Sequence, residues 1–143
     1  MKDLLFGTAG IPLSSDPHTT VDGVRHVRKL GLGAMELEFV RNINITKEKA
    51  PEVKKAAEES NVVLTCHAPY FINLNSLEKA KIKASIERIV NSAKIANLCG
   101  GWSVCFHSGF YMGQEPKKVY DVVKDNIKEI VSRLKNDSNN IWV

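Results

Sequence analysis

The chain has 143 residues, of which 43% are hydrophobic and 25% are charged, and its formal net charge is +4. This length suits one domain with an ordinary hydrophobic core, and the composition excludes disordered and collagen-like chains. No run of residues approaches the roughly 18–20 consecutive apolar positions that a membrane-spanning helix needs, so we expect no membrane partner. The three cysteines lack CxxC spacing, which indicates no disulfide framework and a cytoplasmic location.

Short runs typical of strands alternate along the chain with longer segments of helical period. We expect strands at residues 4–6, 34–40, 62–67 and 102–107. We expect helices at residues 19–30, 51–60, 76–98 and from Pro116 through Leu134, the first with a capping Thr19 and a terminating Gly31. Residues 141–143 have the composition of the start of a fifth strand.

This alternation indicates parallel strands joined by right-handed crossover helices. Two α/β architectures fit: an open doubly wound sheet, and the first half of a (β/α)8 barrel of the TIM type, which usually needs about 250 residues. Neither GxGxxG nor GxxxxGK[ST] follows the first strand, so nucleotide-binding open sheets lose support. A chain that ends within a strand would leave an unpaired sheet edge. We therefore expect residues 1–143 to be the N-terminal half of a single barrel domain, with four βα units and the start of strand five.

Two histidines occupy equivalent positions, at the carboxyl ends of the third and fourth predicted strands. Because side chains alternate along a strand, His67 and His107 each lie on the more polar face of their strand, which would point into a barrel. Barrels of this type hold their active sites at that end. Adjacent strands lie about 4.8 Å apart, so the two rings could bind one metal ion. Alternatively, each is a hydrogen-bonded residue at a strand end, since no Asp or Glu lies near either in sequence.

Glu36 and Glu38 share one face of the second predicted strand, opposite its apolar residues. Paired carboxylates at this position could bind a metal ion or act as a general base, with Glu38 nearer the functional end. They could equally pair with lysine, arginine or water at a barrel rim. Cys105 also faces inward, and we expect it to fill space in the core.

The segments that carry these residues resemble a known family. His67-Ala68-Pro69-Tyr70-Phe71-Ile72-Asn73-Leu74 and Phe106-His107-Ser108-Gly109 resemble the third- and fourth-strand motifs of the endonuclease IV family of DNA-repair enzymes (AP endonuclease family 2), archaeal members above all. The resemblance covers the whole chain in order. This family belongs to the xylose isomerase-like barrels, whose sugar isomerases and epimerases can show similar His-Ala-Pro-Tyr and His-x-Gly segments.

The resemblance implies a complete (β/α)8 barrel with up to three zinc ions that hydrolyses the phosphodiester 5′ of an abasic site. It implies that His67 and His107 bind one zinc together with a Glu from the fifth strand, beyond Val143. It also implies that Tyr70, and Arg41 in the loop after strand two, contact damaged double-stranded DNA. The 143 residues alone would then supply at most a partial zinc site, lack nuclease activity and self-associate through open strand edges.

Two features depart from the nuclease pattern. The family's first strand usually ends in Gly-x-His, whereas this chain has Phe6-Gly7-Thr8. Glu36, in a Met-Glu-Leu segment, is more typical of the sugar-isomerase relatives. The alternative hypotheses are a metal-dependent sugar isomerase or epimerase, which moves a proton beside a carbonyl, and a fragment or scaffold without catalysis.

Overall fold

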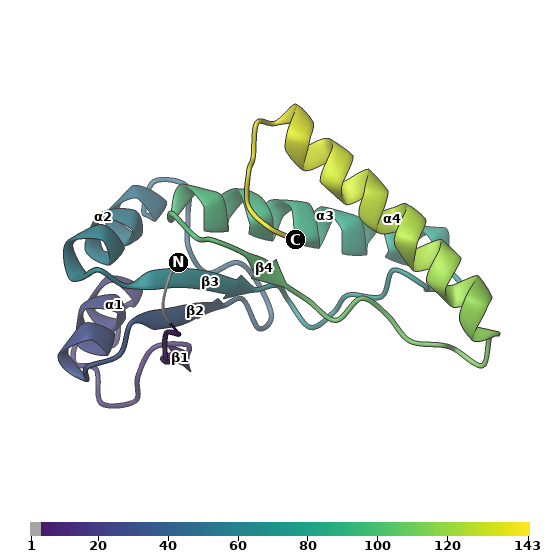
Figure 1. Ribbon diagram of the computed structural model, residues 1–143. Helices are drawn as coiled ribbons and strands as arrows, with labels where there is room; N and C mark the ends of the chain where they lie inside the picture. Colours follow the sequence, from purple (N-terminus) through teal and green to yellow (C-terminus); the bar gives the residue numbers. More distant parts are fainter. Residues whose placement is uncertain (1–3) are drawn as a thin grey trace.

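The computed structural model describes residues 4–143, and in this range parallel strands alternate with helices (Figure 1). The strands are β1 (Gly7–Ala9), β2 (Ala34–Glu38), β3 (Val63–His67) and β4 (Val104–Cys105). The helices are α1 (Thr20–Lys29), α2 (Ala50–Ser60), α3 (Lys79–Leu98) and α4 (Pro116–Asn136). The strands lie in the order β1-β2-β3-β4, each parallel to its neighbours. This is the expected α/β architecture, with a sheet that corresponds to part of a TIM barrel.

One face of the sheet packs against the helices, because right-handed crossovers between sequential parallel strands place all helices on the same side. Alternate strand residues turn toward this side and are buried, among them Met35, Leu37, Leu64 and Cys66. The helices contribute the other half of the core, including Val24, Val27, Val53, Ile86, Ile89, Val90 and Ile130. Strand residues of the opposite set, such as Glu38 and His67, are only half buried. The sheet therefore has an apolar face that packs against the helices, here called the outer face. Its opposite face, here called the inner face, is more polar and carries Glu38 and His67.

The first helix follows the sequence prediction at both ends. The Thr19 hydroxyl accepts a hydrogen bond from the N–H of Asp22 at 3.2 Å, which satisfies one of the free donors of the first turn. Gly31, after the helix, has φ of +78°, a left-handed conformation that glycine adopts without strain. These local signals fix α1 independently of its packing.

The prediction of a strand at residues 4–6 was wrong. Leu4 and Phe6 are 80% and 70% exposed, and β1 begins only at Gly7. A Cβ on Gly7 would lie 2.1 Å from the carbonyl oxygen of Ala34 on β2. Close backbone approach at a glycine, and not the apolar run before it, therefore determines where the first strand forms.

Several further elements are shorter than predicted, and β2, for example, ends at Glu38 instead of residue 40. The third helix begins at Lys79 instead of residue 76, and β4 comprises two residues in place of six. Pairing of β4 with β3 ends early, because the chain then turns to the loop after β3, where the carbonyl of Ser108 accepts a hydrogen bond from the N–H of Leu74. His107 consequently lies beyond the strand, in the β4–α4 loop.

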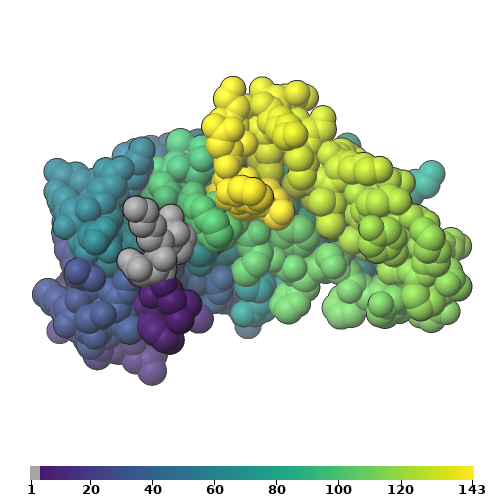
Figure 2. Space-filling model, viewed as in Figure 1, coloured from purple at the N-terminus to yellow at the C-terminus, as the bar shows by residue number. Residues whose placement is uncertain are grey.

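The residues predicted to begin a fifth strand lie beside β4. Trp142 forms a parallel bridge with Ser103, donating its N–H to the carbonyl of Trp102 at 3.2 Å and accepting from the N–H of Val104 at 2.8 Å. Figure 2 shows α4 and these C-terminal residues as a continuous yellow-green to yellow ridge on one side of the molecule. No helix within residues 4–143 has the length and hydropathy to cross a membrane.

Candidate metal-binding site

Three rings gather at the carboxyl ends of β3 and β4. The ring centroids of His67 and His107 are 5.2 Å apart, and the Tyr70 ring lies 5.0 Å from the first and 5.7 Å from the second. His67, the last residue of β3, is half buried, whereas His107 and Tyr70 are exposed. The structure therefore brings together both predicted metal ligands and one of the two residues predicted to contact DNA.

The hydrogen bond at His67 decides which ring nitrogen is free. Its Nδ1 lies 2.7 Å from the carbonyl oxygen of Ala68, and a carbonyl can only accept, so Nδ1 carries the proton of the neutral ring. The lone pair is then on Nε2, the form in which imidazole binds a metal ion. A hydrogen bond of this kind also fixes the orientation of a metal-binding histidine.

The carboxylates of Glu36 and Glu38 lie on the inner face of β2, where Glu38 is close to His67 and Tyr70. The strand register places Glu38 directly opposite His67. Burial, followed by the contact with Glu36, raises the pKa of Glu38 above its usual range, and the nearby His67 opposes this shift only in part. Within residues 4–143, neither carboxylate forms an ion pair with lysine or arginine. Two adjacent acids, neither of them paired with lysine or arginine in this range, thus lie on the same face of the sheet as His67.

Cys105 does not fill space in the core, contrary to the sequence prediction, because it is exposed on the inner face of the sheet. Its Sγ donates a hydrogen bond to Oε2 of Glu36 at 3.3 Å. Partial burial and this carboxylate raise the pKa of the Cys105 thiol to about 11. The contact joins residues 69 positions apart, so no local sequence signal could have shown it. Arg41 is exposed in the loop that follows β2.

Zinc in a catalytic site usually has about three protein ligands. Within residues 4–143, no three His, Cys, Asp or Glu side chains form a group that could hold a metal ion. The two converging imidazoles, one of them with a fixed tautomer, fit two positions of a zinc site. The fit is therefore partial, as two ligands of a larger set.

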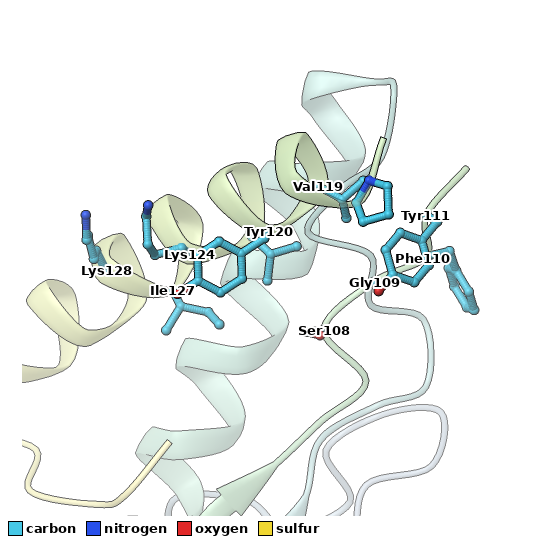
Figure 3. A pocket seen from close by; sticks show the side chains of 11 residues that line it. Ser108, Gly109, Phe110, Tyr111, Val119, Tyr120, Lys124, Ile127 and Lys128 are labelled. Atoms are coloured by element: carbon cyan, nitrogen blue, oxygen red, sulfur yellow. The ribbon is translucent and has the colours of Figure 1, made fainter. Parts of the chain in front are cut away.

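A cavity of about 460 Å³ lies between α4 and the loop after β4. Figure 3 shows its lining, with Tyr120 and Ile127 of α4 on one side and Ser108 and Gly109 of the loop on the other. One lining residue, Ser108, directly follows His107 in the sequence. The lining includes none of the candidate metal ligands or carboxylates.

The chain belongs to the xylose isomerase-like TIM barrel family, whose model matches residues 24–142. An uncharacterized protein of Methanocaldococcus jannaschii is 40% identical over 131 residues, which are 92% of this chain and 46% of that protein. The chain thus spans about half the length of this curated relative.

Solved structures share the fold at low sequence identity. A D-tagatose 3-epimerase-like protein matches with a TM-score of 0.72 and 16% identity, over 93% of this chain and 49% of that one. A D-psicose 3-epimerase matches with a TM-score of 0.73 and 15% identity, over 96% and 51%. Endonuclease IV from Thermus thermophilus matches with a TM-score of 0.65 and 18% identity, over 89% and 47%. These similarities show the fold alone, and they include both a nuclease and sugar epimerases.

Proposed function

We propose that these residues belong to a zinc-dependent endonuclease that hydrolyses the phosphodiester 5′ of an abasic site in double-stranded DNA. The main support for the proposal is the cluster formed by the rings of His67, His107 and Tyr70. The two histidines come from the ends of successive strands, and the Tyr70 ring lies close to both. The motifs around His67 and His107 resemble those of endonuclease IV, and a solved endonuclease IV shares the fold. Since the chain covers about half of each compared protein, we also propose that it forms the N-terminal half of one barrel domain.

Each residue has a separate task in this reaction. His67, oriented by the Ala68 carbonyl, and His107 would be two of the ligands that hold one zinc ion. Zinc, when bound, would polarise the phosphate and lower the pKa of the water that attacks phosphorus. Abasic DNA lacks a base but keeps its phosphates, so recognition depends on backbone charge and on residues that enter the gap. The exposed ring of Tyr70 suits that gap, and the exposed guanidinium of Arg41 suits the phosphates.

A metal-dependent sugar isomerase or epimerase is the second candidate, and the carboxylate pair favours it. Glu38, whose pKa is raised, is suited to take a proton from the carbon beside a carbonyl, with the C–H electron pair moving to form an enediolate. A second acid, on the opposite face of that carbon, would have to donate a proton to complete an epimerisation. The two epimerase structures also match with higher TM-scores than the endonuclease does.

The two candidates can be separated with a protein that carries these residues in a complete barrel. With zinc present, we expect cleavage of a duplex bearing one tetrahydrofuran abasic analogue, 5′ of the analogue, and none of the undamaged duplex. His107→Ala should abolish cleavage, whereas Glu38→Gln should leave most of it. No cleavage by zinc-loaded protein, together with turnover of a ketose that Glu38→Gln stops, would establish the epimerase instead.

A further inference from the structure

We propose that Asn73 and Asn75 are positioning residues that hold His107 beside His67. They do so by clamping the loop after β4 onto the loop after β3. This inference deepens the proposed function, since it rests on His107 being a metal ligand. β4 ends at Cys105, two residues before His107, so pairing with β3 does not hold this histidine in place. Its position depends on what fixes the residues that follow it.

The loop after β3, which contains Asn73 and Asn75, is hydrogen-bonded to both long helices, α3 and α4. The N–H of Asn73 donates to the hydroxyl of Ser85 on α3 at 3.0 Å, and that buried hydroxyl donates to the carbonyl of Lys81 at 2.8 Å. From α4, Nδ2 of Asn126 donates to the carbonyl of Leu74 at 2.9 Å. The loop after β3 is therefore tied to α3 and α4 on either side of the clamp.

From this loop, two amide side chains reach the loop after β4. Nδ2 of Asn75, a residue that is 3% exposed, donates to the carbonyl of Phe110 at 2.8 Å. Oδ1 of Asn73 accepts from the N–H of Asn75 at 3.0 Å and, more weakly, from the N–H of Phe110 at 3.4 Å. Both polar groups of the Phe110 backbone are thus held by the clamp, three residues after His107.

Gly109 makes this close approach possible. A Cβ at this position would lie 2.8 Å from Oδ1 of Asn73 and 3.3 Å from the backbone nitrogen of Asn75, so a side chain would push the loop away from the clamp. The hydrogen bond from the N–H of Leu74 to the carbonyl of Ser108, at 2.8 Å, completes the same contact. Glycine in the His-x-Gly segment therefore allows the two loops to pack closely in this chain.

The test uses the protein with a complete barrel, labelled with ¹³C in its histidine rings and kept in metal-free buffer. Wild type should show a nuclear Overhauser effect between the imidazole protons of His67 and His107. Asn73→Ala should lose it, and the Phe110 amide should exchange about fivefold to tenfold faster with solvent, the loss expected for one hydrogen bond. Asn73→Asp, whose carboxylate still accepts from both N–H groups, should restore both readouts.

Asn139→Ala is the matched control. Asn139 is also a buried amide with two backbone partners, the carbonyl of Ala93 and the N–H of Ile141, but it lies outside the clamp. It should lower the melting temperature without altering the contact between the histidines. Persistence of the contact in Asn73→Ala, or its equal loss in Asn139→Ala, would overturn the proposal.

If Asn73→Ala does not fold, amide exchange of the wild-type protein still tests the proposal. If the clamp holds the loop, the Phe110 amide must exchange more slowly than the amide of exposed Met112; equal rates would also overturn the proposal. Neither readout uses zinc or DNA, so absence of nuclease activity would not decide it. Zinc affinity gives an additional measure, with a loss of about tenfold expected in Asn73→Ala, as for other residues that orient metal ligands.

Discussion

Histidines in this chain are specialised by the groups they contact. In the neutral ring of His67 the lone pair is on Nε2, because the Ala68 carbonyl binds the Nδ1 proton, and the ring centroid lies 5.2 Å from that of His107. His26, in contrast, lies on α1, where Nε2 is within hydrogen-bond distance of the Ser14 hydroxyl at 2.8 Å. Replacement by Ala should therefore have different effects on zinc binding at His67 and at His26.

Replacing His67 or His107 by Ala in the complete barrel should cost zinc binding and activity far more than stability. Each change removes a ligand but little core volume, so we expect bound zinc to fall by about tenfold or more. Elemental analysis and thermal unfolding measure the two effects, and His26→Ala should change neither. Unchanged zinc content with a clearly lowered melting temperature would identify His67 and His107 as structural residues instead.

The thiol of Cys105 reports on the neighbouring carboxylates. Glu36→Gln removes a negative charge beside a thiol whose pKa is about 11, so the pKa should fall and the thiolate fraction at mildly alkaline pH should rise. Alkylation of Cys105 by iodoacetamide in metal-free buffer should become several times faster, as followed by mass spectrometry. The buried Cys66 and Cys99 serve as internal controls and should remain unmodified. Equal rates in wild type and variant would show that the hydrogen bond does not form in solution.

At the scale of elements, side chains within α4 add to the support that this helix receives from the core. Oε2 of Glu115 accepts from the N–H of Lys118 at 3.0 Å and caps the first turn. One turn later, Asp121 pairs with Lys117 at 2.9 Å and with Lys124 at 2.7 Å. These two lysines hold the pKa of Asp121 at about 2.

Asp121→Asn should remove a contribution to stability that depends on pH. A carboxyl group with a lowered folded-state pKa stabilises the protein above its unfolded pKa, and this stabilisation is lost as pH falls through the folded value. The difference in free energy of unfolding between wild type and variant should therefore be present at neutral pH and disappear between about pH 4 and about pH 2. Urea unfolding followed by circular dichroism measures it.

The same difference should shrink at high salt, because the three side chains are exposed and screened. Asp125→Asn is the control on the same helix, since Asp125 pairs with one lysine, Lys128, and should show a smaller effect. A difference for Asp121→Asn that persists at about pH 2 would mean that the side chain acts through helix propensity and not through its charge.

Which elements the sequence could predict depended on where their stability comes from. The bounds of α1 follow from Thr19 and Gly31, which act locally. The bounds of β1 and β4 depend on contacts with distant segments, such as Gly7 against β2 and the loop after β4 against Asn73. For the same reason, alternation along strands predicted the side of the sheet on which His67 lies but not the hydrogen bond of Cys105 or the asparagine clamp.

For the molecule as a whole, the main feature is a sheet covered on one face only. Large apolar side chains are exposed near its two edges, with Phe6 before β1 and the neighbouring rings of Trp102 and Trp142 beside β4, 6.5 Å apart. The cavity under α4 adds further apolar surface from Val119 and Ile127. Exposed apolar patches next to sheet edges with unpaired backbone groups favour association.

We therefore expect the 143-residue chain by itself to form a dimer or larger assembly, to bind zinc weakly and to lack nuclease activity. Sedimentation at micromolar concentration tests the first point. The double variant Phe6→Lys/Trp142→Lys should shift the chain toward monomer by placing charge at both edges. Leu13→Lys should not, because Leu13, although almost fully exposed, lies in the loop between β1 and α1.

A stable monomeric wild type would mean that the inner face tolerates water, as in an open sheet. Tight stoichiometric zinc in that monomer would mean that Glu38, opposite His67, completes a site within these residues.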